Sequence, residues 1–218
     1  MSFRPASALI RQPVAKLGGQ PVWLDEPFWP ASRAFGAQMT FVGQVPIPGP
    51  ELRMTYLFVT QDDLAVAETY APDAGENALI VQPGGRIPRF LVGSSTGDGP
   101  SLWRRGATWA EMVPVELHID LSALGGADER ALGEEIAWQE AERNGIFCDP
   151  PEHDRVPLRS YVGGKPLFWQ AHVGVPEPWQ FFFQLDGGEG WGDGNWSGAC
   201  DPLMIRRLRA SKDDRRRA

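Results

Sequence analysis

The feature that most restricts the fold of this chain is a residue pattern that occurs twice. Residues 18–30 (GGQPVWLDEPFWP) precede an apolar stretch that ends at Gln44, and residues 163–179 (GGKPLFWQAHVGVPEPW) precede one that ends at Gln184. Both copies begin with Gly-Gly-x-Pro and continue through aromatic residues and a Pro/Trp pair. Gly-Gly permits positive φ angles and Pro fixes the exit of the chain, so each copy predicts a turn that introduces a strand. Together they predict an internal duplication.

Aligning the two copies assigns equivalent positions to their turns and strands. The spacing from the second glycine to the strand phenylalanine is 22 residues in the first copy and 17 in the second, a difference that a loop of variable length accommodates. We expect each glutamine to tie its strand to its Gly-Gly-x-Pro turn, and contact with a ligand is the alternative. The predicted equivalent pairs are Gly18 and Gly163, Gly19 and Gly164, Pro21 and Pro166, Phe41 and Phe181, and Gln44 and Gln184.

These segments, in this order, resemble the YwqG-like domain family of bacteria. The resemblance rests on KLGGQPVWLDEPFWP, MTFVGQVP, GGKPLFWQ, FFFQLDG and WGDG, and it covers most of residues 14–205. It implies a two-fold duplicated, β-rich protein of a family in which no enzymatic activity is established. The family is distantly similar to programmed-cell-death-2-type proteins, which chaperone a ribosomal protein, and some members resemble immunity proteins. The chain departs from the family pattern at WGDGNWSGACDPLMIRR.

The remaining sequence favours strands over helices. Gly (25) and Pro (20) make up about a fifth of the chain, which is typical of short strands joined by tight turns. We therefore predict an α+β, β-rich fold, an internally duplicated unit with antiparallel sheets and few helices. Between the repeats, β-branched and aromatic residues predict strands at 52–60, 78–82, 89–93 and 113–121.

One segment, residues 128–145, has the pattern of a helix. Asp128 is a plausible N-cap, and Gly145 suits a left-handed stop after Asn144. An apolar side is predicted from Leu132, Ile136, Trp138 and Ala141.

The predicted organisation is a single domain between two terminal extensions. Its parts are an N-terminal arm at 1–13, a YwqG-like domain at 14–205 with repeats at about 14–60 and 161–205 and an intervening segment at 61–160, and a basic tail at 206–218.

Charge is unevenly distributed along the chain. Residues 206–218 carry seven cations and two anions, whereas residues 1–205 carry 14 cations and 26 anions. An acidic body with a net charge of −12 is a poor ligand for nucleic acid, so we expect none to bind it. We expect no membrane partner, because no stretch of sufficient apolar length occurs. The absence of an apolar leader pattern and the wide separation of Cys148 and Cys200 favour a cytoplasmic protein.

The residues that could carry chemistry are scattered. Cys148 and His153, His118 and Asp120, and the isolated His172 and Cys200 lack the spacing of a structural zinc site. The chain has no HExxH, G-x-S-x-G or P-loop motif. We therefore expect no metal and no cofactor, and leave open cation binding by the acidic loop 186–201.

The resemblance, the acidic body and the lack of a catalytic motif favour a non-enzymatic protein-binding module of chaperone or immunity-protein type. A basic polypeptide is the expected partner, because Arg and Lys gain charge pairing and cation–π contact on an acidic surface lined by tryptophan. The alternatives are a hydrolase that uses carboxylates and a structural or regulatory subunit of an oligomer. The candidate partner-binding residues are Trp23, Asp25, Glu26, Trp29, Trp169, Asp186, Trp191 and Asp193.

Overall fold

The computed structural model describes most of the chain. The described residues are 1–61, 71, 73–108, 110–123, 125–151, 160–167, 179–185 and 202–206, with the backbone alone described at 179–180 and 202–206. They divide into two compact units, one formed by the described residues up to 123 and the other by those from 125 onward. The described residues of the two predicted repeats lie in different units.

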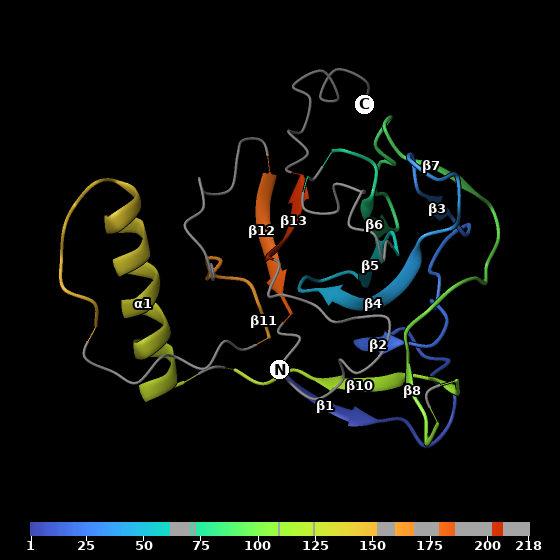
Figure 1. Ribbon diagram of the computed structural model, residues 1–218, viewed down its shortest axis with the longest axis horizontal. Helices are drawn as coiled ribbons and strands as arrows, with labels where there is room; N and C mark the ends of the chain where they lie inside the picture. Colours follow the sequence, from blue (N-terminus) through green and yellow to red (C-terminus); the bar gives the residue numbers. More distant parts are fainter. Residues whose placement is uncertain are drawn as a thin grey trace. The chain divides into compact units, whose positions relative to one another are not determined.

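The first unit is built on a six-stranded antiparallel sheet (Figure 1). Its strands, in spatial order, are β1 (Ser2–Pro5), β10 (Glu116–Asp120), β2 (Lys16–Gly18), β4 (Thr40–Ile47), β5 (Arg53–Val59) and β6 (Asn77–Gln82). The prediction of an N-terminal arm outside the domain is wrong at β1, which pairs with β10 from Ser2↔Asp120 to Pro5↔Leu117. Only four residues long and largely exposed, β1 gives little apolar pattern for a sequence-based prediction.

Two small antiparallel sheets complete this unit. One pairs β3 (Trp29–Ala31) with β7 (Val92–Ser94), and the other pairs β8 (Trp103–Arg105) with β9 (Met112–Pro114). The strands predicted at 52–60 and 78–82 are confirmed as β5 and β6. The strand predicted at 113–121 is divided between β9, which pairs with β8, and β10, which pairs with β1 and β2. The strand predicted at 89–93 overlaps β7 only at its end.

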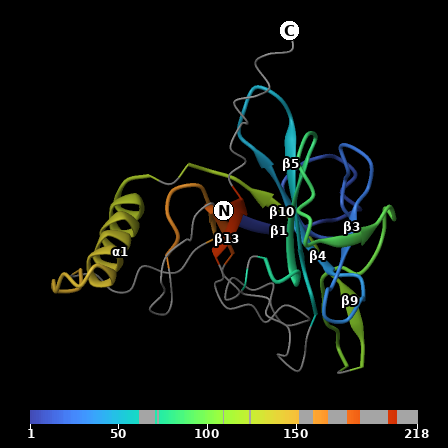
Figure 2. The same ribbon diagram turned by 90° about the horizontal axis from the view of Figure 1, so that it is seen from above.

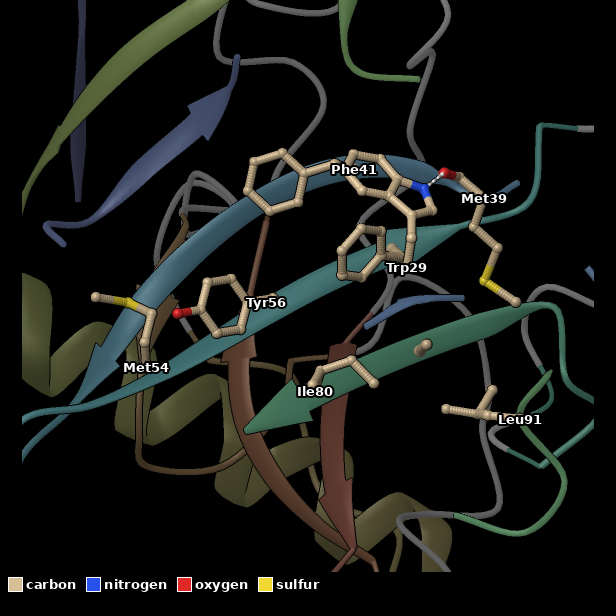
Figure 3. Packing of buried hydrophobic residues seen from close by; sticks show 9 residues of the cluster. Trp29, Met39, Phe41, Met54, Tyr56, Ile80 and Leu91 are labelled. Atoms are coloured by element: carbon tan, nitrogen blue, oxygen red, sulfur yellow. Dashed lines mark hydrogen bonds between the residues drawn. The ribbon is translucent and has the colours of Figure 1, made fainter. Parts of the chain in front are cut away.

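The core of the first unit lies on one face of β4, β5 and β6. Alternate residues of β5 and β6, among them Met54, Tyr56 and Ile80, point to this face and are buried (Figure 3). The loop before β3 and β3 itself lie on one side of β4 and β5, and Trp29 packs into the core from there (Figure 2). Aromatic residues therefore cover the face of the sheet next to this loop. Each aromatic side chain buries a large apolar area there.

Trp29 was expected on a partner-binding surface, and that prediction is wrong. Its side chain is 0% exposed, and its indole N–H donates to the Met39 carbonyl at 2.8 Å (Figure 3). A ring with no accessible surface contacts no docked partner. Trp29 is a core residue, since its ring packs edge-on against Phe58 with centroids 5.2 Å apart.

The second unit contains a three-stranded antiparallel sheet and a helix. The strands are β11 (Tyr161–Val162), β12 (Trp179–Gln184) and β13 (Pro202–Arg206), in that spatial order, and the helix is α1 (Ala127–Arg143). The described chain is thus β-rich, an α+β protein with one helix and several antiparallel sheets in its described part.

The ends of α1 agree in part with the prediction. Gly145 has the expected left-handed conformation, with φ 73°, and ends the helix. Asp128 is not the N-cap, because the helix begins at Ala127 and Gly126 occupies the cap position with no side-chain cap. Asp128 lies in the first turn instead, where its negative charge interacts favourably with the positive end of the helix dipole. The predicted apolar side is only partly covered, since no residue of α1 is buried.

Among the described residues, no helix has the length and apolar character that crossing a membrane requires.

Candidate functional site

The Gly-Gly turn after β2 is shaped by close contact with the neighbouring chain. Gly18 and Gly19 have φ angles of 65° and 63°, a conformation that other residues rarely adopt. The Gly19 amide donates to the Val115 carbonyl at 2.9 Å. A Cβ on Gly18 would lie 2.0 Å from that same oxygen, so only glycine fits there.

Gln44 of β4 holds the loop that follows this turn. Its Oε1 accepts a hydrogen bond from the Val22 amide at 2.8 Å, and its Nε2 donates to the Val14 carbonyl at 3.0 Å. The side chain is 1% exposed, and both ends of its amide have partners. Gln44 therefore connects β4 to the chain on both sides of the Gly-Gly turn.

Tyr56 of β5, which lies opposite Gln44 in the sheet, holds the same loop. Its hydroxyl donates to the Val22 carbonyl at 2.8 Å and accepts from the Leu24 amide at 3.0 Å. Burial raises the pKa of Tyr56 to about 12; the hydrogen bond from Leu24 partly opposes this, and the nearby charge of Asp25 adds to it. The phenol therefore stays protonated and able to donate.

Gln82 of β6 provides the third attachment. Its Oε1 accepts from the amides of Leu24 at 3.2 Å and Asp25 at 3.1 Å, and its Nε2 donates to the Glu26 carbonyl at 2.8 Å. Sequence analysis did not single out Tyr56 or Gln82. The signal that identified Gln44, a glutamine that ends an apolar strand, is also present in ALIVQ at 78–82.

Trp23 lies half-buried above the sheet, at the edge of the core. Its ring lies nearly parallel to that of Phe58, with centroids 6.0 Å apart, and its centroid is 4.7 Å from that of Tyr56. The indole N–H donates to the Gly97 carbonyl at 2.9 Å. The ring is thus fixed by packing and by a hydrogen bond, although the residue as a whole is only partly buried.

Three exposed carboxylates stand beside Trp23. Asp25 and Glu26 follow it on the fixed loop, and Asp98 lies next to Gly97. The Asp98 segment is also held by Gln20, whose amide exchanges two hydrogen bonds of 3.0 Å with the backbone of Gly99. Asp98 was missed because TGDGPS indicates only a turn. We call Trp23, Asp25, Glu26 and Asp98 the acidic corner.

A comparable arrangement surrounds Gln184 in the second unit. Its Oε1 accepts from the Leu167 amide at 3.1 Å, at the position after the Gly-Gly-x-Pro turn that corresponds to Val22. It also accepts from the Tyr161 hydroxyl at 3.2 Å. Gln184 is 0% exposed, and its Nε2 has no hydrogen-bond partner among the described residues. Gly163 and Gly164 have φ angles of 75° and 74°.

A buried ion pair lies beside the first turn. Lys16 of β2 donates to Glu116 of β10 at 2.7 Å, with side chains 1% and 12% exposed. Lys16 also donates to the Ile10 carbonyl at 3.3 Å, and Glu116 accepts from the Ile10 amide at 3.2 Å. Burial lowers the pKa of Lys16 below its usual 10.5, and the pairing with Glu116 offsets part of that effect. Together these contacts attach the N-terminal segment to the sheet.

Half of the predicted partner-binding residues lie outside the described part of the chain. They are Trp169, Asp186, Trp191 and Asp193, and the loop 186–201 lies there too. Within the described ranges, no group of three or more His, Cys, Asp or Glu residues is arranged to hold a metal ion.

No protein-family model matches this chain, and no curated protein matches it significantly.

Proposed function

We propose that this protein is a non-enzymatic protein-binding module of chaperone or immunity-protein type, which binds a basic polypeptide at the acidic corner. The observation that carries this proposal is the fixed loop. Asp25 and Glu26 project from backbone held by Gln82, next to an indole held by Gly97. A site whose backbone is already ordered loses little conformational entropy when a partner binds.

The chemistry of the acidic corner suits lysine and arginine. A cation over an exposed indole gains about 0.5–1 kcal/mol, and an exposed ion pair gains about 0.2–1 kcal/mol. Because each contribution is small, binding depends on Trp23 and the three carboxylates acting together. The acidic body adds long-range attraction, which raises the association rate of a basic partner.

We also propose that residues 14–60 and 161–205 are two copies of one unit, and that the protein is related to the YwqG-like family. The pairings Lys16↔Gln44 and Tyr161↔Gln184 support the duplication, because each falls two residues before its Gly-Gly. The irregularities in β4 at Phe41/Gly43 and in β12 at Phe181/Phe183 support it further, since they occur at aligned positions. For the location of the protein we propose the cytoplasm.

The proposed function is tested by isolating the protein with its bound partners from its native cell at low salt. We expect a basic partner whose association slows steeply as ionic strength approaches the physiological range. The double variant Asp25→Lys/Glu26→Lys should weaken the isolated complex by more than tenfold, about 1.4 kcal/mol.

The matched control is Glu134→Lys/Glu142→Lys, which makes the same change in net charge at two exposed positions of α1. We expect the control to retain most of the affinity. An acidic partner, or equal weakening by both double variants, would show that the acidic corner is not the binding site.

A further inference from the structure

In the first unit, strand β10 covers the outer edge of β2. Leu17 pairs with Leu117, and the Gly19 amide donates to the Val115 carbonyl. The absence of side chains at Gly18 and Gly19 makes this approach possible: an added Cβ would lie 2.0 Å from the Val115 oxygen and 2.3 Å from the Glu116 carboxylate, respectively. In this unit, the glycine pair is required by the strand that lies against it.

In the second unit, β11 has the position relative to β12 that β2 has relative to β4. Tyr161 pairs with Gln184, and the Gly163 amide donates to the Phe182 carbonyl at 2.7 Å. Since antiparallel strands alternate their hydrogen-bonding direction, the N–H and C=O of Val162 point away from β12. β11 is an edge strand of the sheet formed by the described residues.

The glycine pair beside β11 has the same backbone conformation as the first pair. Among the described residues, however, no strand corresponding to β10 lies next to it. Gly163 and Gly164 have the same left-handed conformation as Gly18 and Gly19. Within the described residues, no heavy atom lies within 4 Å of the place that a Cβ on either glycine would take. No described residue occupies the space that the backbone of β10 fills in the first unit.

We propose that the edge of β11 binds an extended, cationic segment of a partner polypeptide as an added antiparallel strand. The segment pairs with the N–H and C=O of Val162 and with the N–H of Gly164, as β10 pairs with Leu17 and Gly19. Strand addition of this kind takes its affinity from main-chain hydrogen bonds. A cationic occupant fits because the described residues of this unit, from 125 to 206, carry seven anions and four cations. The choice of a basic partner rests on the proposed function, whereas the choice of edge does not.

The test uses the full chain and a synthetic peptide of alternating lysine and valine, acetyl-KVKVKVK-amide. Hydrogen exchange is followed at individual amides by NMR. Without peptide, the amides of Val162 and Gly164 should exchange rapidly, and saturating peptide should slow both by about tenfold or more. The peptide acetyl-KVKPKVK-amide has a similar charge but lacks one donor and should protect them poorly. The peptide acetyl-EVEVEVE-amide should not protect them.

A pair of glycine variants tests the geometry. Asn tolerates the left-handed conformation, so Gly163→Asn keeps the turn while placing a side chain in the open space, and it should abolish the protection. Gly145→Asn makes the same change at a left-handed glycine that follows α1, also with open space around it, and should leave protection intact.

Three results would overturn the proposal. The first is slow exchange of Val162 and Gly164 before peptide is added, which shows that the chain itself covers the edge. The second is protection that grows with protein concentration alone, which shows that a second copy binds there. The third is equal protection by the proline peptide and by acetyl-KVKVKVK-amide, or full protection by the latter in Gly163→Asn. Asp25→Lys/Glu26→Lys separates the two proposals. If this variant loses the native partner while the peptide still protects Val162 and Gly164, both proposals are supported. If the variant binds the native partner as the parent does and the peptide still protects the edge, only the proposal of the acidic corner is wrong.

Discussion

At the scale of single residues, Trp23 and Trp29 have different environments although both follow the same turn. Trp29 fills the core and satisfies its N–H internally, whereas Trp23 lies half-buried at the edge. We predict that Trp29→Ala lowers the free energy of unfolding by about 3–5 kcal/mol, as for other buried aromatic residues. Trp23→Phe, which keeps most ring packing and loses one hydrogen bond to Gly97, should cost only about 1 kcal/mol. Urea denaturation measures both, and equal losses would contradict the assigned burial.

Tyr56 makes stability depend on alkaline pH. Its pKa is raised from 10.0 to about 12 in the folded protein, so above pH 10 the unfolded state releases this proton first. The resulting stabilisation is fully present below pH 10 and is lost as pH rises through 12, and it amounts to about 2–3 kcal/mol. We predict that Tyr56→Phe is less stable at pH 8 but loses less further stability than the parent between pH 10 and 12.

Urea denaturation at a series of pH values measures this difference. All other titrating groups, including Lys16 with its lowered pKa, are common to both proteins and cancel in the comparison. Parallel pH profiles for parent and variant would show that the Tyr56 hydroxyl is not buried away from water.

At the scale of elements, β2 is attached to β10 by a charge pair with little access to water. We predict that Lys16→Met lowers the free energy of unfolding by about 3 kcal/mol, because Glu116 is left charged and poorly solvated. In Lys16→Met/Glu116→Gln, the amide still accepts from the Ile10 N–H without an unpaired charge, so part of the loss should be recovered. Chemical denaturation provides the comparison, and a single variant as stable as the parent would contradict it.

The two glycine pairs also differ at this scale. Replacing either Gly18 or Gly163 by Ala places a side chain in the left-handed region, at a cost of about 1–2 kcal/mol. At Gly18 the new Cβ also meets the Val115 carbonyl, whereas at Gly163 it meets no described residue. We predict a larger loss for Gly18→Ala, by about 1–3 kcal/mol, as typical of overpacking. Thermal denaturation followed by circular dichroism measures it; similar losses would argue that β10 moves aside easily.

At the scale of the whole molecule, charge is the property most closely tied to the proposed function. Deleting residues 207–218 removes six cations and two anions and changes the net charge from −7 to −11. We predict faster association with the native basic partner, and a steeper dependence of that rate on ionic strength. Stopped-flow measurements at several salt concentrations test this. A deletion that slows association would indicate that the tail itself contacts the partner.

Much of the local structure could be predicted from the sequence because it depends on residues close together. The β-branched and apolar content of residues 78–82 is enough to indicate β6, and Gly145 after Asn144 is enough to end α1. The positive φ angles of Gly18 and Gly19 follow from glycine's own freedom. The internal duplication and the role of the second Gly-Gly pair remain predictions that begin from the same local patterns.

Features of the candidate site that depend on distant partners required the tertiary structure. Tyr56 and Gln82 lie 32 and 58 residues from Leu24, whose amide both accept. Asp98 is next to Trp23 only because the Gly97 carbonyl accepts from an indole 74 residues away. Sequence alone determined that this chain would form strands, a glycine-rich turn and an acidic surface. Tertiary structure decided which tryptophan is buried and which carboxylates share a corner, because burial and hydrogen bonding depend on which strands pair across the sheet.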